Sequence, residues 1–314
     1  MKNPIVDEAE ARDIRDSVHR LLRDLGNPEP PLNLTVVRDR LELDRGYYSS
    51  KSTSGLDEFV HKLRVGTKQI AKRPMLLVDA IRTLSLRALY FPDTKRILID
   101  EDLPKLKHRW AEGHEIGHSL IWWHKDYLLG DSETELSPAC HAVIEAEANF
   151  ACGQLLFLQQ RFVDDAMSLA VEFKSISALH ARYGNTLTST LWRFIESHQG
   201  SRPLVAIVSS HPQHSPPDFN PRNPCRYCVQ SPAFRLKFSR VTEVALFGAI
   251  RGYCWSHQKP GPLGNGEVAL IDDNGETHMF HFQSFSNKYE VLTLGSHVTP
   301  LSRTVSRPNI SAAI

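Results

Sequence analysis

Two histidines four residues apart, with a glutamate directly after the first, most constrain what this chain can be: His114-Glu115-Ile116-Gly117-His118. Apolar residues around them recur at helical spacing, so we expect a helix from about residue 105 to about residue 123. On such a helix the two histidines lie about 40° apart around the axis and about 6 Å apart along it. Two imidazoles on one helical face can bind a single metal ion. The sequence therefore predicts a metal site on this helix.

Glu115 gives the pattern its chemical meaning. In zinc peptidases of the H-E-x-x-H type, the metal polarises the scissile carbonyl and the glutamate accepts a proton from the attacking water. The chain has 15 histidines and 36 acidic residues in 314 positions, so this pattern arises by chance in roughly 4% of such chains. The helical context and a preceding strand pair strengthen the interpretation. His114 and His118 are predicted zinc ligands, and Glu115 is the predicted general base.

A catalytic zinc ion normally takes a third ligand from the protein. A second helix is expected from about residue 137 to about residue 160, and it carries Glu145 and Glu147. The two carboxylates point about 160° apart around a helix, so only one of them can face the histidine pair. Helical geometry by itself leaves that choice open.

Three segments together resemble the ImmA/IrrE family of zinc metallopeptidases. They are Arg109 to His118, the strand sequence Ala88-Leu89-Tyr90-Phe91-Pro92, and Glu145-Ala146-Glu147-Ala148-Asn149 followed by Leu155-Leu156. The resemblance runs from about residue 30 to about residue 198. It implies that Glu145 is the third zinc ligand, with Glu147 as its rival. It also implies a zinc-dependent endopeptidase that cleaves a helix-turn-helix repressor and so relieves repression.

The chain departs from the family pattern around the motif. Family members commonly have Phe-Thr where this chain has Trp110-Ala111, and many have a histidine where this chain has Trp122. His124 lies two residues further on, and we expect it at the surface or in packing rather than in the site. These departures leave the zinc chemistry intact and concern the choice of substrate.

A second cluster has metal-ligand spacing. Cys225 and Cys228 are followed by Cys254 and His257 in the form C-x2-C…C-x2-H, which suits a structural zinc ion. The alternative is independent buried cysteines and a surface histidine. Five cysteines without a secretory signal predict no disulfide framework and a cytoplasmic location.

The pattern along the chain predicts an α+β fold. Residues 1–200 should form a zincin-like helical metallopeptidase domain with a small sheet, which includes strands near residues 88–91 and 96–100. Residues 201–300 should form a smaller β-rich domain of unknown role, with a hairpin turn at Asp273-Asn274-Gly275. Residues 46–55 are expected in a loop and 301–314 in a disordered tail.

Charge and hydropathy exclude some classes of partner. The formal net charge is +1, so direct binding of nucleic acid is not expected. No run approaches the ~18 apolar residues of a membrane span. The main alternative to a peptidase is a zinc-containing regulatory protein that binds a partner without cleaving it. Glu115 favours the enzyme, because a purely structural site does not need it.

Overall fold

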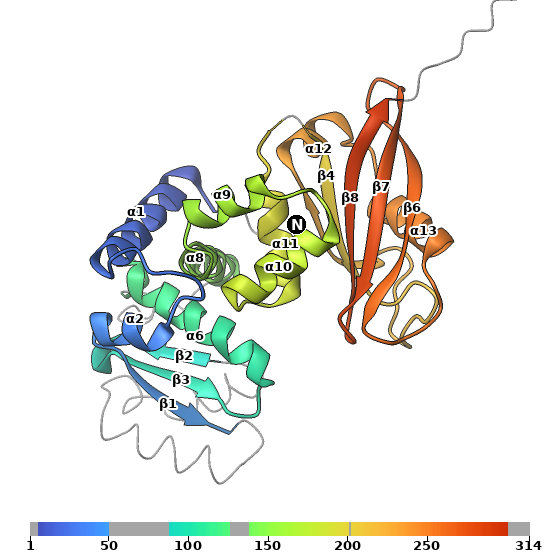
Figure 1. Ribbon diagram of the computed structural model, residues 1–314. Coiled ribbons are helices and arrows are strands. Elements are labelled where there is room, and N and C mark those ends of the chain that lie inside the picture. Colours follow the sequence, from blue (N-terminus) through green and yellow to red (C-terminus); the bar gives the residue numbers. More distant parts are fainter. Residues whose placement is uncertain (1–5, 50–87, 126–137, 201, 301–314) are drawn as a thin grey trace, which may run out of the picture. The chain divides into compact units, whose positions relative to one another are not determined.

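The computed structural model describes residues 6–49, 88–125, 138–200 and 202–300. Its helices and two sheets form a mixed α+β fold, which confirms the predicted fold class (Figure 1). The chain divides into two compact units. One comprises Met1–Asp165 with Ala178–Thr186, and the other comprises Ala166–Ser177 with Leu187–Ile314. The expected tail at 301–314, and residues 50–55 of the expected loop, lie outside the described residues.

The first unit contains a three-stranded sheet of order β1-β3-β2. Strand β2 (Ala88–Phe91) pairs antiparallel with β3 (Arg96–Asp100) through the short 3-10 helix Pro92–Thr94. This arrangement confirms the strand pair predicted from the sequence. Lys95 ends the turn with a φ of 48°.

Strand β1 (Asp44–Tyr48) corrects the sequence interpretation, which placed residues 46–48 in a loop. It pairs in parallel with β3, a strand some fifty positions further along the chain. Because the two strands are not joined by a tight turn, no turn residues in the sequence indicate that β1 is a strand. A Cβ atom on Gly46 would lie 2.7 Å from the Leu98 side chain. The glycine therefore lets β1 lie close against β3.

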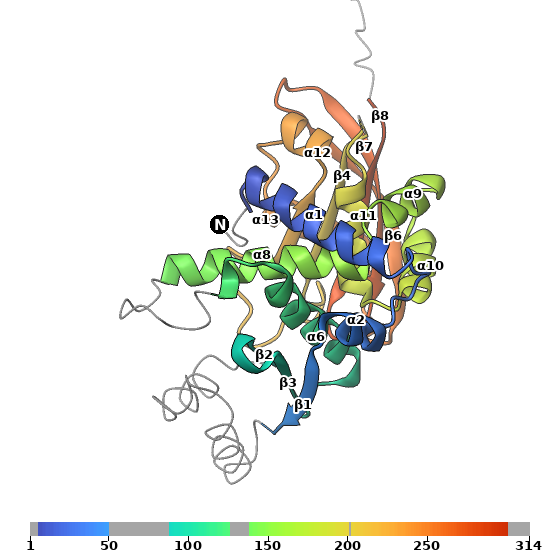
Figure 2. The same cartoon turned by 90° about the vertical axis from the view of Figure 1, so that its left-hand side faces the viewer.

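Helices α1 (Glu8–Asp24), α2 (Leu34–Leu41), α6 (Lys105–Leu120) and α8 (Pro138–Leu156) complete most of this unit. Helix α6 packs on β2 and β3, α8 packs on α6, and α1 packs on α8. Figure 2 shows α8 running between α1 and α6. Helix α1 begins at the cap Asp7, whose carboxylate accepts a hydrogen bond from the Ala9 amide. No helix among the described residues is long and apolar enough to cross a membrane.

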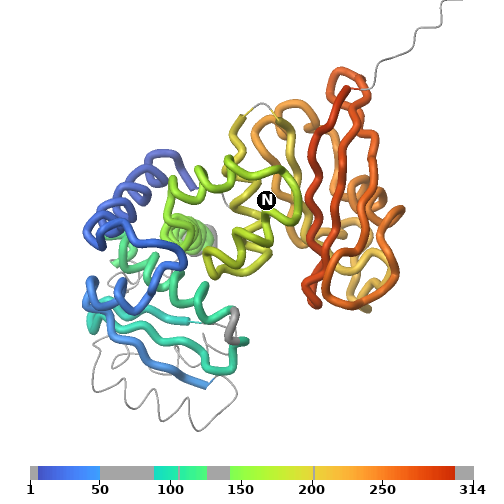
Figure 3. The backbone as a smooth tube through the Cα atoms, viewed as in Figure 1, coloured from blue at the N-terminus to red at the C-terminus, as the bar shows by residue number. Residues whose placement is uncertain are grey.

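Helices α9 (Gln160–Ser168) and α10 (Phe173–Tyr183) each contribute residues to both units, and α11 (Leu187–Ser197) belongs to the second. Figure 3 traces this part of the backbone. Helix α10 ends at Tyr183, and the following Gly184 has a φ of 65°. Glycine adopts that left-handed conformation without a steric penalty.

The second unit is built on a five-stranded antiparallel sheet of order β5-β4-β8-β7-β6. The strands and the two helices that follow β5 have these bounds: β4 Leu204–Ser209, β5 Cys225–Gln230, α12 Pro232–Lys237, α13 Glu243–Tyr253, β6 Gly261–Ile271, β7 Thr277–Ser286 and β8 Val291–Pro300. The predicted turn at Asp273-Asn274-Gly275 joins β6 to β7, and Gly275 has a φ of 84°.

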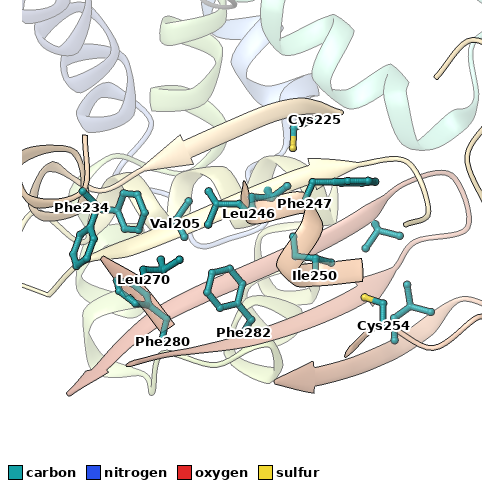
Figure 4. Close-up of a cluster of buried hydrophobic side chains, with 14 residues drawn as sticks. Val205, Cys225, Phe234, Leu246, Phe247, Ile250, Cys254, Leu270, Phe280 and Phe282 are labelled. Carbon is teal, nitrogen blue, oxygen red and sulfur yellow. The ribbon is translucent and has the colours of Figure 1, made fainter. Parts of the chain in front are cut away.

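The core of this unit lies between the sheet and the helices α12 and α13. Figure 4 shows Phe234 of α12 and Ile250 of α13 in one apolar cluster with Phe280 and Phe282 of β7. Strand β4 is buried along its whole length, because α11 also packs against it. The alternating burial of β7 is typical of a strand with one face on a core.

Candidate metal centre

Helix α6 carries the H-E-x-x-H motif, as the sequence predicts, and it ends at Leu120 rather than near residue 123. Ile116 is fully buried and anchors the helix in the unit. His114, Glu115 and His118 are consequently held on a helix that packs between the sheet and α8.

Small residues bring α8 close to this part of α6. A Cβ atom on Gly117 would lie 2.7 Å from the Ala148 carbonyl oxygen and 3.3 Å from the Ala151 Cβ. Ala148 and Ala151 are themselves fully buried. The two helix backbones therefore approach more closely than larger side chains would allow, and α8 can present short side chains to the histidines.

Glu145 is the carboxylate that faces the histidine pair. Its Oε2 lies 3.2 Å from Nε2 of His114, and its Oε1 lies 3.6 Å from Nε2 of His118. The two Nε2 atoms lie 3.2 Å apart. These three side chains form one of two groups in the described part of the chain whose donor atoms could jointly hold a metal ion.

The outer nitrogens of both histidines are occupied. Nδ1–H of His114 donates to Oδ1 of Asn149 at 3.1 Å. Nδ1 of His118 lies 2.9 Å from Nδ1 of His124, whose Nε2–H donates to Glu147 at 2.7 Å. Because His124 gives its proton to Glu147, its Nδ1 is an acceptor and His118 is the donor. Both Nε2 lone pairs are therefore directed at the point where Glu145 also converges.

Three acceptor groups that lie this close together need a cation among them. Two imidazole lone pairs and a carboxylate repel one another at these distances unless a proton or a metal ion lies among them. A tetrahedral zinc site with metal–nitrogen bonds of about 2.0–2.1 Å separates its ligand atoms by about 3.3 Å. The observed separations of 3.2, 3.2 and 3.6 Å fit that geometry. The donor set therefore suits a divalent metal ion such as zinc.

The pKa values of these groups reflect their mutual contacts. Burial acts to lower the pKa of His114, but the hydrogen bond to Glu145 and the charge of Glu115 outweigh it, so this pKa is raised. Burial lowers the pKa of His118. Burial alone would raise the pKa of Glu145, but its contacts with Nε2 of both histidines, which are hydrogen bonds when those nitrogens carry protons, hold it well below its usual range. Glu145 therefore stays ionised and available as a ligand.

Glu115 lies beside this group and is not part of it. Its side chain is nearly buried, and burial raises its pKa, with a further contribution from the charge of Glu145. A carboxylate with a raised pKa is a better proton acceptor near neutral pH. The Glu145 side chain keeps 42% of its surface exposed, so the group of ligands is open to solvent on that side.

A buried network behind His118 was not predicted from the sequence. His124 was expected at the surface or in packing; it is fully buried, and burial lowers its pKa to about 4. Its partner Glu147 is also buried and accepts a second hydrogen bond from the Trp123 indole at 2.6 Å. Glu147 therefore supports His124 and does not contact the predicted metal. Burial raises the pKa of Glu10 on α1, and the nearby charge of Glu147 raises it further.

The structure does not assemble the predicted cysteine site. All four of its residues are described, and no three of Cys225, Cys228, Cys254 and His257 bring their donor atoms together. Cys225 and Cys254 are separate members of the apolar core in Figure 4. None of the three cysteines forms a disulfide bond within the described residues. The alternative of independent buried cysteines fits this arrangement, and the predicted ligands of the cluster are not brought together.

The second group that could hold a metal ion lies in the β6–β7 turn and comprises Asp272, Glu276 and His278. Its central carboxylate is already used, since Asp272 Oδ1 accepts from the amides of Asn274 and Glu276. Its Oδ2 lies 3.2 Å from His278 Nε2 and 3.9 Å from the Lys237 ammonium. A nearby cation and saturated oxygens disfavour a metal ion there, so this group stabilises the turn.

The comparisons with known proteins concern the fold. A solved structure described as a Mycobacterium tuberculosis transcriptional regulator is similar to this chain, with a TM-score of 0.50 and 12% identity. The match covers 91% of this chain and 88% of that chain. No protein-family model matches the chain, and no curated protein sequence matches it. The mixed α+β fold is therefore similar to that of this solved structure over most of both chains.

Proposed function

We propose that this chain is a zinc-dependent endopeptidase. The observation that carries the proposal is the convergence of His114, His118 and Glu145 beside the separate carboxylate of Glu115. Three protein ligands with a side open to solvent are typical of catalytic rather than structural zinc sites. A structural site would have no use for a nearly buried fourth group that does not bind the metal.

Each residue has a distinct role in this proposal. Nε2 of His114, Nε2 of His118 and the Glu145 carboxylate would hold zinc, which supplies Lewis acidity that polarises the scissile carbonyl and acidifies water. Glu115 accepts the proton of the attacking water as the new C–O bond forms. It then donates that proton to the amide nitrogen as the C–N bond breaks, which releases the amine.

Two observations bear on the substrate. The motif segments resemble the ImmA/IrrE metallopeptidases, and the fold is similar to that of a transcriptional regulator. We therefore propose that the substrate is a helix-turn-helix repressor, and that its cleavage relieves repression. The effect of the chain on transcription would be indirect, because a formal net charge of +1 provides no general attraction to nucleic acid.

The experiment is co-expression of the chain with a candidate repressor, such as one encoded beside it, followed by an immunoblot for repressor fragments. Wild type should cleave, and Glu115→Gln should bind zinc and fold but not cleave, because an amide cannot accept the proton. General-base catalysis contributes roughly 10²–10⁴ in rate. Glu101→Gln is the matched control, since Glu101 is exposed in the turn after β3. This variant should cleave the repressor as wild type does.

Two results would refute this mechanism. Cleavage by Glu115→Gln at the wild-type rate would exclude Glu115 as the base. If neither form cleaves and both relieve repression, the chain acts by binding its partner, and the zinc ion serves another purpose.

A further inference from the structure

An open pocket of about 380 Å³ lies in the second unit, lined by Arg202, Pro203, Lys237, His297 and Val298. It forms where β4 begins, α12 ends and β8 approaches its last residues. The His297 amide donates to the Pro203 carbonyl at 3.1 Å, so the two strand ends are fixed relative to each other. The volume is within the range of about 300–1,000 Å³ that is usual for small-molecule sites.

The pocket has two cations at its wall. Arg202 is exposed and directs Nε to the His297 carbonyl at 3.3 Å. Within the described ranges, no carboxylate forms an ion pair with its guanidinium. The Lys237 ammonium lies 3.9 Å from Asp272 Oδ2. Since the oxygens of that carboxylate already accept hydrogen bonds from two backbone amides and from His278, the wall retains positive charge.

A buried relay holds His297 in place. Asp272 and His278 are almost completely buried, and Nε2–H of His278 donates to Asp272 Oδ2 at 3.2 Å. Nδ1 of His278 is therefore an acceptor, and Nε2–H of His297 donates to it at 3.1 Å. This leaves Nδ1 of His297 for a ligand, as an acceptor from a protonated oxygen when the ring is neutral.

We propose that this pocket binds a small molecule through an oxyanion, a phosphate or a carboxylate group. The fork of the Arg202 guanidinium matches the paired oxygens of such a group, and Lys237 adds a point charge. Where the ligand is a hydrogen phosphate, Nδ1 of His297 accepts a hydrogen bond from its protonated oxygen, and Asp272 and His278 hold the His297 ring in position. The proposal rests on residues of the second unit alone, so its test is independent of whether the metal centre binds zinc.

The test is a titration of the full chain with inorganic phosphate at constant ionic strength, followed through the ring proton signals of His297 by NMR. Wild type should show a saturable shift. Arg202→Gln and Lys237→Gln should each raise the phosphate Kd about tenfold, which corresponds to about 1.4 kcal/mol. Arg235→Gln is the matched control, because Arg235 is an exposed cation on α12 that does not line the pocket, and it should leave the Kd within twofold.

A parallel titration with acetate distinguishes a phosphate ligand from a carboxylate ligand. A saturable response to either anion that depends on Arg202 and Lys237 supports the proposal. Circular dichroism confirms that each variant is folded. If neither anion gives a saturable shift, or if Arg235→Gln weakens binding as much as the pocket variants do, the pocket is not an oxyanion site.

Discussion

Nδ1 of His118 lies 2.9 Å from Nδ1 of His124, and this contact directs the other nitrogen of His118 toward the predicted metal. Outer hydrogen bonds of this kind fix the tautomer and the ring orientation of a ligating histidine. His124 can act in this way because it is held in turn by the buried carboxylate of Glu147.

His124 is therefore expected to tune the affinity for zinc. His124→Phe removes the acceptor for His118 Nδ1–H and should weaken zinc binding by roughly 10–100-fold. His124→Gln should restore most of it, because an amide oxygen can accept that hydrogen bond. His19→Phe is the control, since His19 is exposed on α1. Competition with a chelator measures the zinc affinity of all three variants. Equal affinities for the three would exclude a positioning role for His124.

Glu145 and Glu147 should respond differently to the same substitution. Glu145→Ala removes a predicted ligand and should reduce zinc affinity by more than the roughly 10–100-fold typical of outer-shell changes. Glu147→Ala leaves the donors of Trp123 and His124 unpaired, so it should cost about 1–3 kcal/mol in the free energy of unfolding. Zinc titration and urea unfolding separate the two effects. Loss of zinc with Glu147→Ala alone would reverse the assignment.

Two glycines on the contacting helices should have opposite effects on stability. Gly117→Ala places a Cβ atom 2.7 Å from the Ala148 carbonyl and should destabilise the fold by about 1–3 kcal/mol. Gly153→Ala meets nothing within 4 Å on α8 and should stabilise it by about 0.4–1 kcal/mol. Urea unfolding of the two variants checks this. An unchanged stability for Gly117→Ala would show that the helices need no close approach there.

The sequence could predict the motif helix because its signal is local. His114 and His118 lie on one face of any helix that includes them, whatever surrounds it. The choice between Glu145 and Glu147 was different, because it depends on how α8 is rotated against α6. That rotation is set by contacts such as Gly117 against Ala148, between residues distant in sequence. Only the family resemblance pointed to Glu145 beforehand.

His124 and the cysteines show where local patterns mislead. The helix was expected to continue to about residue 123, which would place His124 on the far side from His118. It ends at Leu120 instead, and the following turn brings His124 back to His118. Cys225 and Cys254 have the spacing of zinc ligands, but they lie at β5 and at the end of α13 as apolar core residues. Spacing cannot reveal that burial.

Metal content tests the central claim most directly. Elemental analysis of the purified chain should find one zinc ion per molecule. Of the two groups of described residues that could hold a metal ion, the one around Asp272 has its central carboxylate engaged by two backbone amides and lies near Lys237. His114→Ala should lose that ion, and Cys228→Ser should keep it, since the cysteines do not converge. Full zinc retention by His114→Ala, or two ions per chain with one lost in Cys228→Ser, would contradict the account.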